Sequence, residues 1–90
     1  MAAQRIPALH LLEQQLVCLI RERLLDTPAT FDVDSNLYEA GLDSMALMQL
    51  LILLEREYAV VLPDSDLTHQ NFGTTRKLAK LIHARSELET

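Results

Sequence analysis

The sequence predicts a small all-α domain, and three observations lead to this prediction. About half of the 90 residues are hydrophobic, and only two Gly and three Pro are present to interrupt helices. Apolar residues recur at three- and four-residue steps, which is the period of an α-helix. With two Tyr, two Phe and no Trp, the core must be mostly aliphatic. Ninety residues suffice for one modest core, so we expect a single domain over residues 1–90, with its core at about 8–85.

The first helix is expected from Ala8 to Leu25. Pro7 stands just before its first turn, where a backbone N–H would lack a partner anyway, and Thr27-Pro28 ends it. The apolar positions follow the helical period: Leu9, Leu12, Leu16, Ile20 and Leu24. Cys18 lies among apolar neighbours, so we expect a buried, unreactive thiol. As the only cysteine, it can form neither an internal disulfide nor a cysteine-based metal cluster.

A long acidic loop is expected from Asp26 to Asp43. It has no basic residue, and loops of this length are usually functional. Several of its residues are apolar, which predicts that the loop is pinned to the core: Phe31, Val33, Leu37, Tyr38 and Leu42. The stretch from Asp32 begins like a calcium-binding EF-hand loop, but Leu37 stands where Gly is required.

The second helix is expected from Ser44 to about Tyr58. At about 100° per residue, one broad face points to the core: Leu47, Leu50, Leu51, Leu54 and Tyr58. Met45, Met48, Ile52 and Leu53 are left over, and the first three lie beside Ser44. Either a neighbouring loop covers these three side chains, or they form a partner-docking face, for which adaptable Met side chains are well suited.

The remaining segments complete the bundle. Ala59–Leu62 forms a short extended link closed by Pro63, and Asp64-Ser65-Asp66 offers capping residues for a brief third helical turn around Leu67 to Gln70. The last helix starts at Thr74 or Thr75. It is expected to bury Leu78, Leu81 and Ile82. Its basic residues are expected to form a solvated face: Arg76, Lys77, Lys80 and Arg85.

Charge and composition exclude several classes of function. The formal net charge of −5 argues against a nucleic-acid partner and is compatible with docking onto basic partners. No apolar run approaches the ~20 residues needed to span a bilayer, and Met1–Arg5 lacks the features of a secretory signal. We therefore expect a cytoplasmic protein without a membrane partner. The histidines are scattered, without the spacing of a zinc pair, and we expect no metal site: His10, His69 and His83.

Ser44 lies where the loop becomes the second helix. The first N–H groups of a helix lack partners there, and the macrodipole favours negative charge. Its hydroxyl can therefore cap the helix or carry a phosphate ester. A hydrolase nucleophile is disfavoured, because Leu42 and Ala46 stand where the nucleophile elbow requires Gly, and no His is near in sequence. Intrinsic catalysis has no visible machinery.

Taken together, these segments resemble the acyl carrier protein family over roughly residues 8 to 85. The central stretch is Gly41-Leu42-Asp43-Ser44-Met45. The other matching stretches are Phe31-x-Val33-x-Ser35-x-Leu37-Tyr38-Glu39, Leu54-Glu55-x-Glu57-Tyr58, Leu62-Pro63-Asp64 and Asn71-Phe72-Gly73-Thr74-Thr75.

The resemblance implies a four-helix bundle with a short third helix and a long first loop. It implies that Ser44 carries 4′-phosphopantetheine, attached from coenzyme A by a separate Mg²⁺-dependent phosphopantetheinyl transferase that Asp43 helps to engage. The thiol of that cofactor would hold acyl or aminoacyl groups as thioesters. A loading ligase would attach them, and downstream transferases or synthases would receive them. The carrier would act as a monomer and would not itself be an enzyme.

Two departures from the family pattern matter. Met45 stands where the family usually has Leu, a volume-conserving change. No charged residue occurs from Met45 to Leu54, where fatty-acid-type carriers bear carboxylates, so apolar contact should dominate docking. This favours a specialised carrier of aminoacyl or secondary-metabolite units over one for fatty acid synthesis, and the cargo stays open. The alternatives are an unmodified interaction or regulatory protein with a carrier fold and, less favoured, a small serine hydrolase.

Overall fold

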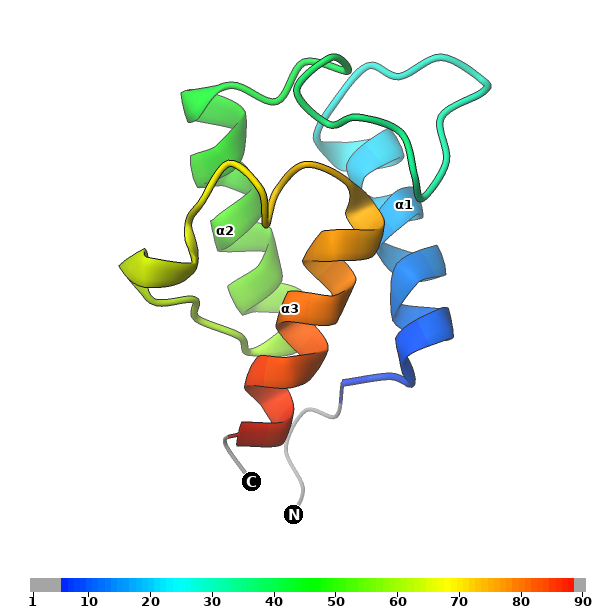
Figure 1. Ribbon diagram of the computed structural model, residues 1–90. Coiled ribbons are helices and arrows are strands. Elements are labelled where there is room, and N and C mark those ends of the chain that lie inside the picture. The colour runs from blue at the N-terminus through cyan, green and yellow to red at the C-terminus, as the bar shows by residue number, and fades with distance from the viewer. Residues whose placement is uncertain (1–5, 89–90) are drawn as a thin grey trace.

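The computed structural model describes residues 6–88, and within that range it contains three α-helices and no β-strand. They are α1 (Leu9–Arg23), α2 (Ser44–Tyr58) and α3 (Thr75–Leu88). Figure 1 shows α2 and α3 running in the same direction and α1 in the opposite one, so the starts of α2 and α3 lie at the same end of the bundle as the end of α1. Among the helix pairs, α1 and α3 are in closest contact. The predicted all-α class is confirmed, while the expectation for Met1–Arg5 lies outside the described residues.

The core is mainly aliphatic, as the composition predicts. Its large, fully buried apolar side chains come from all three helices and from the loops before α2 and α3: Leu12, Leu16, Ile20, Leu37, Leu50, Leu54, Phe72, Leu78 and Ile82. Tyr58 is also buried, and its hydroxyl donates a hydrogen bond to Gln15 Oε1 at 3.0 Å. Burial raises the pKa of Tyr58. Three predicted core residues are only half-buried, because they flank the buried stripe of their helix: Leu47, Leu51 and Leu81.

Cys18 is exposed, so the prediction of a buried thiol is wrong. The run of apolar neighbours around it is misleading. Successive residues of a helix are about 100° apart, which places Cys18 about 200° from Leu16, whose side chain is in the core. The helical period, rather than the apolar run, decides which of these side chains is buried.

The long loop between α1 and α2 is pinned to the core, as predicted. Phe31, Leu37 and Leu42 are buried. The backbone N–H of Leu37 donates to Gly73 O at 2.9 Å, and that of Arg76 donates to Val33 O at 3.0 Å. The loop is thereby fixed to the start of α3, which lies far away in sequence.

The short third helix is displaced and reduced relative to the prediction. Asp64–Asp66 forms a single 3₁₀ turn, and no helix forms over residues 67–70. Beyond the turn, the side chain of Asn71 donates to Asp66 O at 2.9 Å, and the Asn71 N–H donates to Thr68 Oγ1 at 3.1 Å. Such side-chain bonds to the backbone compete with helical ones, so the residues expected to be helical form turns instead.

The basic residues of α3 do not form a uniformly solvated face, contrary to the prediction. Arg76 makes a bidentate pair with Asp34 at 2.7 and 3.0 Å and lies 3.6 Å from the buried carboxylate of Glu13. Arg85 makes a bidentate pair with Asp66. Hydrogen bonds from the two guanidinium groups hold the pKa values of Asp34 and Asp66 below the ordinary range.

We expect Arg76→Gln to lower the melting temperature more than Arg23→Gln does. Arg76 joins the loop to α3 and neutralises the buried Glu13, whereas Arg23 pairs with the half-exposed Glu57. Such surface pairs contribute little to stability.

The stability contributed by the Arg76–Asp34 pair should also depend on pH. The pKa of Asp34 is lower in the folded than in the unfolded state, so the pair stabilises the fold above the pKa of the unfolded state, and this stabilisation is lost as the pH falls. The difference between wild type and Arg76→Gln should therefore narrow below about pH 4. Thermal unfolding followed by circular dichroism at several pH values measures both effects, and equal melting temperatures for the two variants would contradict this prediction.

Candidate attachment site at the start of the second helix

Asp43, rather than Ser44, caps α2. Asp43 has extended backbone angles, φ −119° and ψ −172°, and its Oδ1 accepts a hydrogen bond from the Ala46 N–H at 2.9 Å. Its carbonyl accepts the first intrahelical bond, from the Leu47 N–H at 2.8 Å. Both features define an N-cap residue. One of the unpartnered N–H groups of the helix end is therefore satisfied without Ser44.

The Ser44 side chain is left free by this arrangement. Ser44 is the first residue of α2 and is exposed. Within residues 6–88 its hydroxyl has no hydrogen-bond partner, so no histidine or carboxylate of the described chain activates it as a nucleophile. An exposed hydroxyl at the positive end of a helix is a suitable position for a phosphate ester. The residues present therefore fit a covalently attached phosphate-bearing group.

A tight turn at Gly41 precedes the start of α2. Gly41 has φ +117°, a conformation that residues with a side chain rarely adopt. Directly after it, Leu42 is buried, and its N–H donates to Leu37 O at 2.9 Å. The turn thus anchors Leu42 in the core immediately before Asp43 and Ser44, which fixes where the hydroxyl emerges.

The loop before α2 is also held by a contact with His69, in the segment before α3. The rings of Tyr38 and His69 stack with centroids 4.0 Å apart, and the Tyr38 hydroxyl donates to His69 O at 3.0 Å. Burial raises the pKa of Tyr38. No local pattern in the sequence indicates the Tyr38–His69 pair, because 31 residues separate its members.

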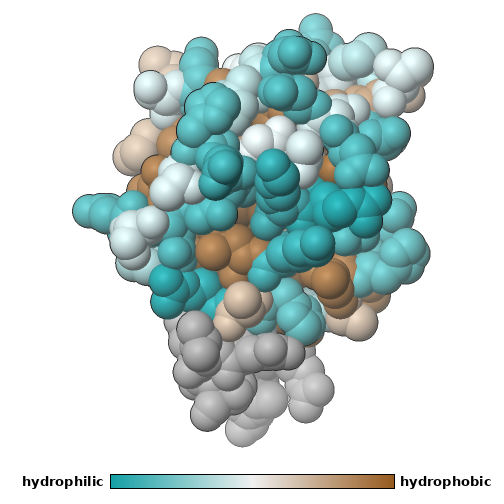
Figure 2. All heavy atoms as spheres, in the orientation of Figure 1, coloured by the Kyte–Doolittle hydropathy of each residue, from teal (hydrophilic) through white to brown (hydrophobic). Residues whose placement is uncertain are grey.

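The three apolar residues beside Ser44 are exposed. Met45 is 72% exposed, Met48 61% and Ile52 52%, and we call them the α2 apolar face. Figure 2 shows apolar surface along the margin of the molecule over α2. The alternative that a neighbouring loop covers these side chains is therefore wrong for the described part of the chain. The docking role of the face stays a prediction.

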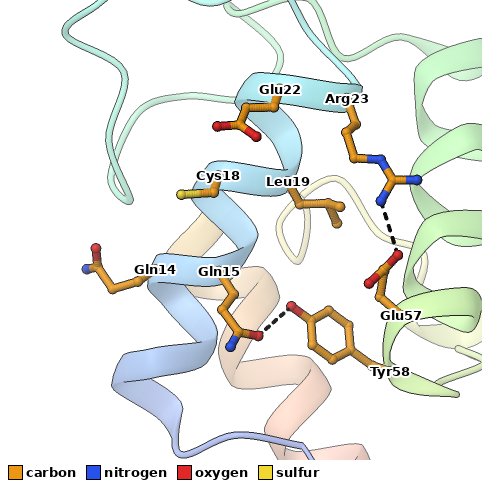
Figure 3. Close-up of a pocket in the computed structure, with 8 residues that line it drawn as sticks. All are labelled: Gln14, Gln15, Cys18, Leu19, Glu22, Arg23, Glu57 and Tyr58. Atoms are coloured by element: carbon orange, nitrogen blue, oxygen red, sulfur yellow. Dashed lines mark hydrogen bonds and ion pairs between the residues drawn. The ribbon is translucent and has the colours of Figure 1, made fainter.

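A shallow groove of about 510 Å³ lies between α1 and the end of α2. Figure 3 shows it bridged by the Gln15–Tyr58 hydrogen bond and the Arg23–Glu57 pair, with Cys18 directed away from α2. In residues 6–88 no group of three or more His, Cys, Asp or Glu side chains could hold a metal ion. None of the helices in this range has the length and apolar character needed to cross a membrane.

Comparison with known proteins identifies the family. Residues 14–82 match the family model described as the phosphopantetheine attachment site. Aminoacyl carrier protein 2 of Bradyrhizobium diazoefficiens is 26% identical over 72 residues, which cover 78% of this chain and 81% of that protein. The D-alanyl carrier protein of Lactococcus lactis subsp. cremoris is 32% identical over 57 residues, covering 62% of this chain and 72% of that protein.

Two solved structures share the fold. One is a carrier protein from Agrobacterium tumefaciens in complex with ATP and an engineered glycine:[carrier protein] ligase of Bradyrhizobium japonicum. It is 28% identical, has a TM-score of 0.62, and the match covers 73% of this chain and 87% of that one. The other is a glycylated carrier protein bound to the Bradyrhizobium japonicum ligase, 22% identical with a TM-score of 0.62, covering 82% and 97%.

The matched region includes the whole of α2 and extends from α1 into α3. The chain therefore belongs to the acyl carrier protein family, the phosphopantetheine-binding carrier proteins, and its cofactor is covalently attached 4′-phosphopantetheine.

Proposed function

We propose that Ser44 is the attachment point of 4′-phosphopantetheine and that the chain carries aminoacyl groups as thioesters for partner enzymes. The observation that carries this proposal is the division of roles at the start of α2. Asp43 satisfies the helix end, and the neighbouring Ser44 hydroxyl is exposed and unpartnered within the described residues. A transferase can therefore reach Ser44 Oγ without unfolding the helix.

The prosthetic group supplies a terminal thiol, which holds the cargo as a thioester. The chain itself contributes the position of that group. Ser44 Oγ provides the ester linkage, and the start of α2 stabilises the negative charge of the phosphate. The buried Leu42 and the Asp43 cap hold the attachment point rigid relative to the core, so the flexible reach comes from the prosthetic group alone.

Aminoacyl cargo is supported by the relatives, since an aminoacyl carrier and a D-alanyl carrier are among the proteins that this chain resembles. Three partners are proposed. They are a phosphopantetheinyl transferase, an ATP-dependent aminoacyl ligase related to the glycine:[carrier protein] ligase of the similar solved complex, and a downstream acceptor enzyme. In this proposal the carrier is a monomer in the cytoplasm and catalyses no reaction itself.

The α2 apolar face is the proposed docking surface for these enzymes. It begins at Met45, next to the attachment serine, and continues over two turns to Ile52. No charged residue lies on α2 before Glu55. Association through this face should therefore depend mainly on apolar burial and only weakly on salt.

Incubation of the purified chain with coenzyme A, Mg²⁺ and a broad-specificity phosphopantetheinyl transferase should add one phosphopantetheine. Intact-mass spectrometry measures the addition, and peptide mapping should place it on Ser44. Ser44→Ala should stay unmodified, while Ser35→Ala, a change in the preceding loop, should be modified like wild type. If wild type stays unmodified while a control carrier is fully converted, the chain is instead a carrier-fold interaction or regulatory protein.

Variants at Asp43 should separate its cap from its recognition by the transferase. Asp43→Ala removes the cap and should lower the free energy of unfolding by about 1 kcal/mol. Asp43→Asn keeps a capping oxygen without the charge, so its stability should stay close to that of wild type. We expect Asp43→Asn to raise the KM of the transferase for the apo-carrier. If Asp43→Asn has the same transferase KM as wild type, the charge of Asp43 is not recognised by the transferase and the residue acts only as a cap.

Charge introduced into the α2 apolar face should weaken docking. We expect Met48→Glu and Ile52→Glu to lower kcat/KM for loading by a cognate ligase by at least tenfold, while circular dichroism shows the helical fold retained. Val61→Glu is the matched control, because Val61 is also an exposed apolar residue, 64% exposed, but lies beyond α2. If all three variants are loaded with the same kcat/KM, the α2 apolar face is not the docking surface.

A further inference from the structure

A second surface feature lies on α3, apart from the α2 apolar face. The turn before α3 and the exposed side of α3 enclose an open hollow of about 460 Å³. Five residues line it, none of them acidic: Gln70, Asn71, Lys77, Lys80 and Leu81. In a chain of formal net charge −5, a hollow with two lysines and no carboxylate is a local exception.

The charge of these lysines is not neutralised within the described residues. Three arginines there are paired with carboxylates: Arg23 with Glu57, Arg76 with Asp34, and Arg85 with Asp66. Lys77 and Lys80 are exposed and have no acidic partner among the side chains described, residues 6–86.

Asp66 lies next to the hollow, but its carboxylate does not neutralise the two lysines. The Asn71 side chain donates to the backbone carbonyl of Asp66, but the carboxylate of Asp66 is occupied by the bidentate pair with Arg85. The hollow therefore keeps a net positive charge at its lining.

The lining matches the chemistry of an acidic protein segment. Lys77 and Lys80 are three residues apart on one helix, so both ammonium groups can reach the same segment. The amides of Gln70 and Asn71 provide polar contacts for a peptide backbone, and the half-buried Leu81 offers apolar contact for the stem of a Glu side chain. The hollow is small, so a short acidic segment can lie within it, whereas an extended anionic surface such as nucleic acid or an acidic membrane would also face the acidic remainder of the chain.

We propose that this hollow is a second docking point, which binds a glutamate-rich segment of a partner protein. It lies on a different helix from the attachment serine and does not require the prosthetic group. Opposite charges at this point would set the orientation of a partner that gains most of its affinity on the α2 apolar face, since charge complementarity contributes mainly to specificity and association rate.

The test uses the full chain without its prosthetic group, labelled with ¹⁵N, and an acetylated hexaglutamate peptide as the probe. At an ionic strength of about 0.01 M, where the Debye length is about 30 Å, the largest amide shifts should map to residues 70–81. Because single exposed ion pairs are weak, each lysine should contribute about two- to fivefold in Kd. Lys77→Gln/Lys80→Gln should therefore weaken binding by about four- to twenty-fivefold.

Arg56→Glu is the matched control, because it changes the net charge by the same amount on α2. It should weaken binding less than twofold. Equal weakening by the control and the double variant would overturn the proposal, since net charge alone would then account for binding. So would shifts outside residues 70–81, no binding at low ionic strength, or displacement of the peptide by an equal concentration of inorganic phosphate. Ser44→Ala should bind the peptide like wild type, so this result is independent of the attachment proposed for Ser44.

Discussion

The hydrogen bond from the Ala46 N–H to the Asp43 carboxylate is the interaction on which the chemistry of this molecule depends. A helix start needs a capping acceptor, and a serine at that point would ordinarily serve as one. Because Asp43 takes this role, the hydroxyl one residue later is free to face solvent. The same helix end then favours a negatively charged substituent on that hydroxyl. One short side chain thus stabilises α2 and makes Ser44 accessible.

The position of this helix start is fixed from a distance. The preceding loop carries buried anchors at Phe31, Leu37 and Leu42, and its backbone is hydrogen-bonded to Gly73 and Arg76 near the start of α3. Figure 1 shows the loop crossing the end of the bundle where α2 and α3 begin. A loop held in this way has few alternative conformations, so Ser44, the proposed attachment point, has a defined place although it follows a long irregular segment.

α2 is apolar on two sides, of which one is buried and the other exposed. Leu50 and Leu54 are fully buried, whereas Met48 and Ile52 on the other side are exposed. A helix that is hydrophobic all round is normally buried, so an exposed second side is a cost that folding alone does not explain. Transient coverage by partner enzymes, as proposed for the α2 apolar face, would account for it. The cationic hollow on α3 complements this arrangement, because it offers charge where α2 offers none.

The sequence alone determined what depends on near neighbours in the chain. The helical period located α1 and α2 within two residues of their bounds and identified Leu50 and Leu54 as core. Ser44 was placed at the first residue of α2. These features could be predicted because period, caps and breakers act within a few residues.

The tertiary structure decided what depends on contacts between distant segments. The Arg76–Asp34 pair spans 42 residues and the Arg85–Asp66 pair spans 19, so no local pattern contains them. The competing side-chain bonds of Asn71 and Thr68 kept residues 67–70 out of a helix. Even Asp43 was recognised only as a motif residue and not as the cap. Its backbone angles and its hydrogen bond from the Ala46 N–H are what distinguish it from Ser44 as the capping group.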